Sequence, residues 1–295
     1  MKRSLNIIAL SIMLLTATPS FAEADQLIAD DCTLTLTWRN DFTPAQQDNV
    51  RQWLGAVMQT MRLLNGTLPR KEIRIELQAT RGYGAVPFAR ILRQEPEGVL
   101  FYIDPDSSLA NFVSDWTAYH ELSHLFIPYP GQADIWFSEG LASYYQNVLQ
   151  ARAGLLTRDA AREKLRAGFE RGRNDAGNAD LTLSELSTVM REKHAFMRVY
   201  WSGAMYFLQA DLQLRKLATA DSPVNSLDDV LREFGDCCLN SSRRWSGRQL
   251  AGEFDRISAT DIFTTLYAEY ALSSAIPPYE GMLNEAELNT ILGNY

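Results

Sequence analysis

Two histidines and a glutamate in the segment His120-Glu121-Leu122-Ser123-His124 have the residue types and spacing of a metal-dependent catalytic site. Side chains four positions apart on a helix point the same way, so both imidazoles can bind one metal ion, usually zinc. The carboxylate of Glu121 then lies beside the metal, where it can transfer protons. The alternative is a pair of buried histidines held by core hydrogen bonds. The chain contains only one further histidine, His194, so chance is a poor explanation of the pattern.

A third ligand must come from elsewhere in the chain, because a catalytic zinc usually has three protein ligands and keeps one position open for water. Glu139 is the best candidate, within the segment Trp136-Phe137-Ser138-Glu139-Gly140 and shortly before Ser143-Tyr144-Tyr145. Asp134 is the other nearby acid, but it precedes the helix expected here. Glu139 would then join the two histidines around the metal.

The segment around Glu139 resembles the gluzincin metallopeptidases, in which a second helix supplies the glutamate that completes the zinc site. Its sequence is similar to the glycyl aminopeptidase family and, more loosely, to the aminopeptidase N family. The resemblance implies an α+β fold of the thermolysin-like type, with a small mixed-sheet lobe, a mainly helical lobe and the zinc cleft between them. It also implies Zn²⁺ as cofactor, bound by His120, His124 and Glu139. Glu121 would be the general base for peptide-bond hydrolysis by a zinc-bound water.

A third block, Val199-Tyr200-Trp201-Ser202-Gly203, is similar to the Tyr-x-Lys-Gly segment in which these families place a tyrosine that donates to the oxyanion. By this resemblance Tyr200 is the oxyanion donor. Ser202 stands where the families usually have lysine. The resemblance covers about residues 95–290.

Two departures from the aminopeptidase N pattern limit what can be carried over. The link between His124 and Glu139 is shorter than in that family. Nothing in residues 80–100 matches its Gly-x-Met-Glu-Asn segment, whose glutamate holds the amino end of the substrate; Arg81-Gly82-Tyr83-Gly84-Ala85 contains no carboxylate. The resemblance therefore implies a peptidase without deciding between removal of terminal residues and internal cleavage.

Residues 1–22 have the features of a cleaved secretory signal, with Lys2 and Arg3, an apolar stretch over residues 5–15 and small residues before position 23. We expect a secreted, periplasmic protein without a membrane span. Loss of the signal changes the formal net charge from −8 to about −10. This charge argues against nucleic acid as a partner and leaves a peptide or protein substrate. The sequence does not indicate an oligomeric state.

The three cysteines are Cys32 and the adjacent pair Cys237 and Cys238. In an exported protein we expect Cys32 to form a disulfide with one of the pair, and the sequence leaves open which one. A zinc site made of these cysteines is a poor alternative, because their spacing is not that of a zinc finger.

Residues 23–295 are expected to form one catalytic domain, with a sheet lobe and the motif helix over residues 23–126 and a helical lobe over residues 127–295. Hydrophobic alternation and turn residues mark the strands, and capping residues mark several helix starts. The predicted strands are 32–38, 73–77, 88–92 and 99–103. The predicted helices are 43–64, 114–126, a helix through Glu139 to about 149, 184–192, 200–217, 226–234 and 260–272, with a polar break at 171–180.

Two functions of different classes fit the sequence. The first is a zinc peptidase, and the second is a non-catalytic protein that binds a peptide or cell-wall fragment on the same fold. Glu121 favours the peptidase, because a structural zinc needs no base.

Three further features keep two interpretations each. The resemblance implies that the strand 98–103 is an exposed edge to which a peptide substrate adds, and the alternative is an ordinary strand. His194 either binds substrate or is a surface-loop histidine. Ser143 either orients a metal ligand or packs between helices.

Overall fold

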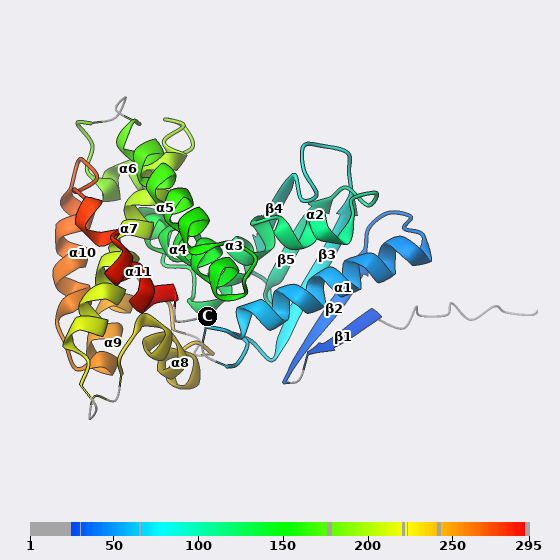
Figure 1. Ribbon diagram of the computed structural model, residues 1–295, viewed down its shortest axis with the longest axis horizontal. Helices are drawn as coiled ribbons and strands as arrows, with labels where there is room; N and C mark the ends of the chain where they lie inside the picture. The colour runs from blue at the N-terminus through cyan, green and yellow to red at the C-terminus, as the bar shows by residue number, and fades with distance from the viewer. Residues whose placement is uncertain are drawn as a thin grey trace, which may run out of the picture.

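The computed structural model describes residues 25–29, 31–64, 66–175, 179–219, 222, 224–240 and 243–292. The predicted signal segment 1–22 lies outside these residues, as do Gly177 and Asn178 of the predicted polar break. One five-stranded sheet and a mainly helical region make up the fold (Figure 1). The coarse α+β prediction is therefore confirmed. None of the described helices is long and apolar enough to cross a membrane.

The sheet has the strand order β1-β2-β3-β5-β4. Strands β2, β3 and β5 are parallel, and the outer strands β1 and β4 run antiparallel to their neighbours. Four of the five strands match the predicted ones closely, and β1 was not predicted. The bounds are β1 Asp25–Ala29, β2 Cys32–Trp38, β3 Glu72–Ala79, β4 Phe88–Leu92 and β5 Gly98–Ile103.

The prediction that strand 98–103 forms an exposed edge is wrong. β5 pairs with β3 on one side and with β4 on the other, and Val99, Leu100 and Phe101 are fully buried. The reason is a local hairpin: residues 93–97 join β4 to β5, and the two strands pair antiparallel, which covers the edge that β5 would otherwise expose. The free edge on this side of the sheet is β4.

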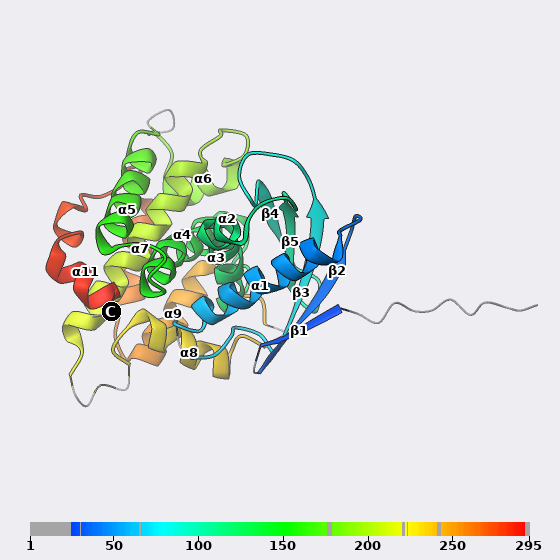
Figure 2. The same cartoon turned by 45° about the vertical axis from the view of Figure 1, so that its right-hand side comes forward.

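Helix α1 (Pro44–Met61) lies across the sheet in both views (Figures 1 and 2). Thr43 is its N-cap and forms a capping box with Gln46. The fully buried Trp53 of α1 packs against Phe101 of β5 and Phe112 of α2, with ring centroids 5.3 and 5.0 Å apart. The other helices are α2 Leu109–Ser114, α3 Thr117–Ser123, α4 Ile135–Arg152, α5 Arg158–Arg173, α6 Leu183–Val189, α7 Phe196–Leu217, α8 Leu227–Cys237, α9 Gly247–Ser258, α10 Ile262–Leu272 and α11 Glu285–Leu292.

The single motif helix predicted over residues 114–126 is divided in the structure. Asp115 has an extended backbone, and its carboxylate accepts a hydrogen bond from the backbone N–H of Thr117 at 2.8 Å. This side-chain acceptor satisfies an N–H at the start of α3, so α2 ends and α3 begins there. The last predicted turn, His124–Phe126, is a 3-10 helix.

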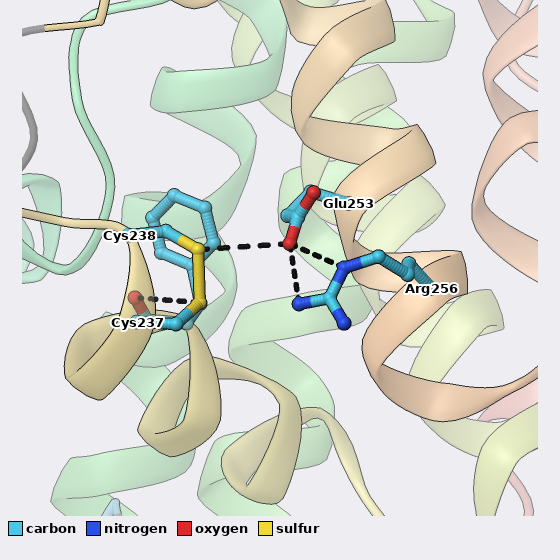
Figure 3. The surroundings of a disulfide bond; sticks show 5 residues. Cys237, Cys238, Glu253 and Arg256 are labelled. Atoms are coloured by element: carbon cyan, nitrogen blue, oxygen red, sulfur yellow. Dashed lines mark hydrogen bonds and ion pairs between the residues drawn. A yellow bond between two sulfur atoms is a disulfide. The ribbon is translucent and has the colours of Figure 1, made fainter.

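The predicted disulfide between Cys32 and the adjacent pair is wrong. Cys237 and Cys238 are bonded to each other at the end of α8, where Cys238 also contacts Glu253 (Figure 3). Cys32 is a free thiol in β2, only 1% exposed. Burial raises its pKa to about 12. Cys32 therefore acts as a small core residue. Cys237 and Cys238 are bonded to each other, so neither has a free thiol to pair with Cys32.

Candidate active site

The structure brings the three predicted metal ligands together. The Nε2 atoms of His120 and His124 lie 3.3 and 3.5 Å from the same carboxylate oxygen of Glu139. A ligand atom from each residue lies within 4.8 Å of the other two. Both histidines are 4% exposed. Two imidazoles and a carboxylate that converge in this way match the donor set of a catalytic zinc site.

A tight turn at Gly131 allows the short link after His124 to bring Glu139 back to the two histidines. Gly131 has a φ of 92°, in the left-handed region that glycine adopts without strain, and α4 begins four residues later. Asp134, the other acid weighed from the sequence, is already engaged. Its two oxygens accept hydrogen bonds from the Gly247 N–H at 2.7 Å and the Tyr267 hydroxyl at 2.5 Å.

Two residues whose role was not predicted from the sequence contact the histidine rings and fix their orientation. The Oε1 atom of Gln146 lies 2.8 Å from Nδ1 of His120, and the Ser138 hydroxyl lies 2.9 Å from Nδ1 of His124. The amide oxygen of Gln146 can only accept, so it places a proton on Nδ1 of His120 and leaves the Nε2 lone pair for a metal; the Ser138 hydroxyl can accept from His124 in the same way. A signal did exist: Gln146 lies two helical turns after Glu139 and on the same face of α4.

The charges at the site oppose one another. Burial favours a neutral Glu139, but the charges and hydrogen bonds of His124 and His120 outweigh it and hold the pKa of Glu139 well below its usual range. Burial lowers the pKa of His120, yet the Glu139 carboxylate outweighs this effect and raises it. Glu121 is different, because burial raises its pKa despite the nearby histidines. Glu139 therefore stays ionised between the two imidazoles, and its negative charge favours binding of a cation.

Tyr200 reaches the site through a close crossing of α4 and α7. A Cβ atom on Gly140 of α4 would lie 2.2 Å from the Gly203 backbone of α7, so only glycines allow this approach. Gly140 follows Glu139, and Tyr200 lies one turn before Gly203, so the crossing brings both functional side chains together. The Tyr200 ring stacks on His120 at 5.9 Å between centroids and 19° between planes. Burial and the nearby Glu139 and Glu121 carboxylates raise the pKa of Tyr200 above its usual range.

The site opens into a cavity of about 640 Å³. Its walls come from β4, α3, α4 and the start of α7, together with the loop residue Tyr129. The lining includes the three ligand candidates, Glu121, Tyr200 and three arginines, Arg90, Arg93 and Arg191. A substrate can therefore reach every predicted site residue.

The residues with two interpretations are also placed. His194 is exposed, has a φ of 53° and lines the cavity at the turn before α7. Ser143 is buried and lines a second cavity of about 420 Å³ that shares His120 and Tyr200 with the first. Ser123 donates to the Tyr119 carbonyl at 2.6 Å within α3, as expected of a packed helix residue.

A family model described as M61 glycyl aminopeptidase matches residues 129–206. The match begins after the histidine motif and contains Glu139 and Tyr200, so it is evidence independent of that motif. No curated protein matches the sequence.

The fold is similar to solved aminopeptidases. An aminopeptidase N family protein from Idiomarina loihiensis has a TM-score of 0.62 at 16% identity, with 88% of this chain and 48% of that chain covered. An M1 zinc metallopeptidase from Deinococcus radiodurans has a TM-score of 0.51 at 15% identity, with coverages of 86% and 52%. A variant of that protein bound to a Tyr-Ser-Ala substrate has a TM-score of 0.50 at 15% identity, with the same coverages.

The chain spans about half the length of these solved structures. The comparisons confirm the resemblance predicted from the motifs. The family match is to a peptidase family, and the solved structures share the fold.

Proposed function

We propose that the protein is a secreted zinc peptidase that hydrolyses peptide bonds, with zinc held by His120, His124 and Glu139. The observation that carries the proposal is the convergence of three ligand atoms within 4.8 Å while other residues engage both Nδ1 atoms. Residues 1–22 support export to the periplasm. Because the cavity lining comes from both the sheet region and the helical region, we propose that residues 23–126 and 127–295 are two lobes of one catalytic domain.

The chain supplies a proton carrier and an oxyanion donor. When bound, zinc polarises a carbonyl and lowers the pKa of water to about 7. Glu121 accepts the proton of the attacking water and delivers it to the leaving amine, and its raised pKa brings it closer to neutral pH. Tyr200 keeps its hydroxyl proton because its pKa is raised, so it donates a hydrogen bond to the developing oxyanion.

The β4 strand is the element on which a peptide substrate would lie. It is the free edge of the sheet, and four of its five residues, 88–91, line the cavity. A peptide added to this edge gains main-chain hydrogen bonds that do not depend on its sequence. The solved Deinococcus metallopeptidase variant of similar fold is bound to a Tyr-Ser-Ala substrate, which supports a peptide as the substrate here.

Profiling of cleavage in a peptide library by mass spectrometry tests the proposal against a non-catalytic binding protein on the same fold. We expect cleavage by the wild type and a loss of about 10²–10⁴-fold in Glu121→Gln, which removes the base. Glu233→Gln is the matched control, because Glu233 is exposed on α8 and does not line the cavity. A zinc-loaded wild type that cleaves no peptide would favour the binding protein.

A further inference from the structure

The cavity that contains the candidate active site has an excess of positive charge. The whole chain carries a formal net charge of −8, yet the cavity lining contains three arginines, Arg90, Arg93 and Arg191, against two carboxylates, Glu121 and Glu139. A divalent metal would increase the excess. The cavity therefore has the opposite charge to the protein as a whole.

The three arginines of the cavity have few carboxylate partners within the protein. Arg93 lies 3.5 Å from Glu97, but the other oxygen of Glu97 already accepts from Arg70 at 2.6 Å. Within the described parts of the chain, Arg90 and Arg191 make no ion pair. At least one guanidinium is thus available to a ligand that enters the cavity.

Two of the arginines line the cavity together with an aromatic residue, and we call this set the arginine wall (Arg93, Tyr129 and Arg191). The guanidinium of Arg93 lies 5.4 Å from the Tyr129 ring centroid. The wall lines the same cavity as Glu121 and Tyr200. The wall therefore faces the reacting groups.

The same cavity lacks a group to hold a free amine. Among the residues that the structure describes, the carboxylates that line it are Glu121 and Glu139, and the proposed function uses both. Arginine, by contrast, presents a planar fork of N–H donors that matches a carboxylate. The chemistry of the lining thus selects an acidic group over an amino group.

We propose that the arginine wall binds a carboxylate of the substrate beside the scissile bond, so that the peptidase prefers acidic peptides and does not require a free amino terminus. This inference rests on the proposed function, because it assigns the substrate class of the same site. The carboxylate is either an Asp or Glu side chain or the C-terminal carboxylate of the peptide.

Binding of uncleaved peptides to zinc-loaded Glu121→Gln protein, measured by calorimetry, tests the inference. The probes are N-acetylated hexapeptides in matched pairs, with Glu against Gln at each position and a free C-terminus against an amide. We expect about tenfold tighter binding of the carboxylate member in one set of pairs, the scale of a hydrogen bond to a charged group. A Glu over Gln preference identifies a side chain, and a free acid preference identifies the C-terminus.

Substitutions then assign the preference to the wall. Arg191→Gln and Arg93→Gln, each added to Glu121→Gln, should bring the ratio of the two dissociation constants toward one. Arg162→Gln is the control, because Arg162 pairs with Asp159 on the exposed face of α5. Equal binding of all pairs, or a preference that survives both arginine substitutions, would overturn the inference.

Cleavage by the wild type separates this inference from the proposed function. Cleavage without any carboxylate preference in binding would overturn the inference and leave the peptidase in place. A carboxylate preference without cleavage of any peptide would retain the arginine wall and reject the peptidase.

Discussion

Helix α4 carries two groups of buried polar side chains that are satisfied in different ways. One is the candidate active site, with Ser138, Glu139 and Gln146 from this helix. The other, which we call the ion network, joins Tyr144, Tyr145 and Arg152 of α4 to Asp211, Arg215 and Asp228. Both groups are buried, so the difference between them lies in their partners.

The ion network is internally complete. Asp211 accepts hydrogen bonds from the Tyr144 hydroxyl at 2.7 Å and the Leu227 N–H at 2.8 Å, and pairs with Arg215 at 3.0 Å. Arg152 pairs with Asp228 at 2.9 Å and also donates to the Ile291 carbonyl. Every carboxylate here has a cationic partner, as the cost of burying charge requires.

The active site is open by comparison. Across the described residues, no hydrogen bond to the Glu121 carboxylate is formed, and Glu121 and the three ligand candidates line a cavity. The comparison teaches that a buried charged group with all its partners stabilises the fold, whereas one left open on a cavity is available for chemistry. Substitutions should therefore affect stability in the ion network and activity in the site.

The largest expected change in stability comes from Asp211→Asn. One carboxylate oxygen becomes an NH₂ group that faces donors, and Arg215 loses its charge partner, so we expect a loss of about 3–5 kcal/mol in the free energy of unfolding. Urea denaturation measures it. Asp159→Asn, at an exposed ion pair, is the matched control and should cost at most about 1 kcal/mol. Equal effects of the two substitutions would contradict the comparison.

Tyr200→Phe should act on the chemistry alone. It removes one oxyanion donor, which is expected to lower kcat by about 10²–10³-fold, or about 2.7–4 kcal/mol, with little change in KM. Steady-state kinetics on a peptide identified by library profiling provides the measurement. Tyr145→Phe, in the ion network, serves as the control. An unchanged kcat in Tyr200→Phe would remove this residue from the mechanism.

Gln146→Leu should weaken metal binding without removing a ligand. Leucine cannot accept a hydrogen bond from the Nδ1–H of His120, so the ring loses its fixed tautomer and orientation. The affinity for zinc should therefore fall by about 10–100-fold. Competition with a chromogenic chelator measures the affinity. Gln146→Glu restores an acceptor and should recover most of it; failure to do so would assign Gln146 to packing instead.

The smallest effect concerns stability and pH in the metal-free protein. Burial raises the pKa of Glu121 in the folded state, so the folded state binds more protons and loses stability as pH rises above the unfolded pKa of about 4.3. Glu121→Gln should therefore be more stable than the wild type at neutral pH, and the difference should vanish below about pH 4.

Thermal unfolding in a chelator across this pH range tests the sign. Glu163→Gln should behave in the opposite way, because the hydrogen bond to Arg166 lowers the pKa of Glu163. A wild type more stable than Glu121→Gln at neutral pH would show that the carboxylate is not an open, buried charge.

The sequence predicts what local spacing determines. The histidine motif, the later glutamate and most element bounds follow from periodicity and short segments, and the structure places these residues together. Pairings between distant segments do not follow. The glycine crossing of α4 and α7 depends on a contact between Gly140 and Gly203, which are far apart in the sequence. The β4–β5 hairpin is local, but the strand positions alone did not show which of the two strands forms the edge. The bond between Cys237 and Cys238 shows the converse, since the structure has a local pairing where we expected a long-range one.

The central claim is that His120, His124 and Glu139 form a zinc site beside a base that is not a ligand. Elemental analysis of purified, zinc-loaded protein after gel filtration tests it most directly. We predict about one zinc ion per chain in the wild type and in Glu121→Gln, and almost none in His120→Ala of the same folded content. A wild type that retains no zinc, or a His120→Ala variant that retains as much as the wild type, would contradict the account.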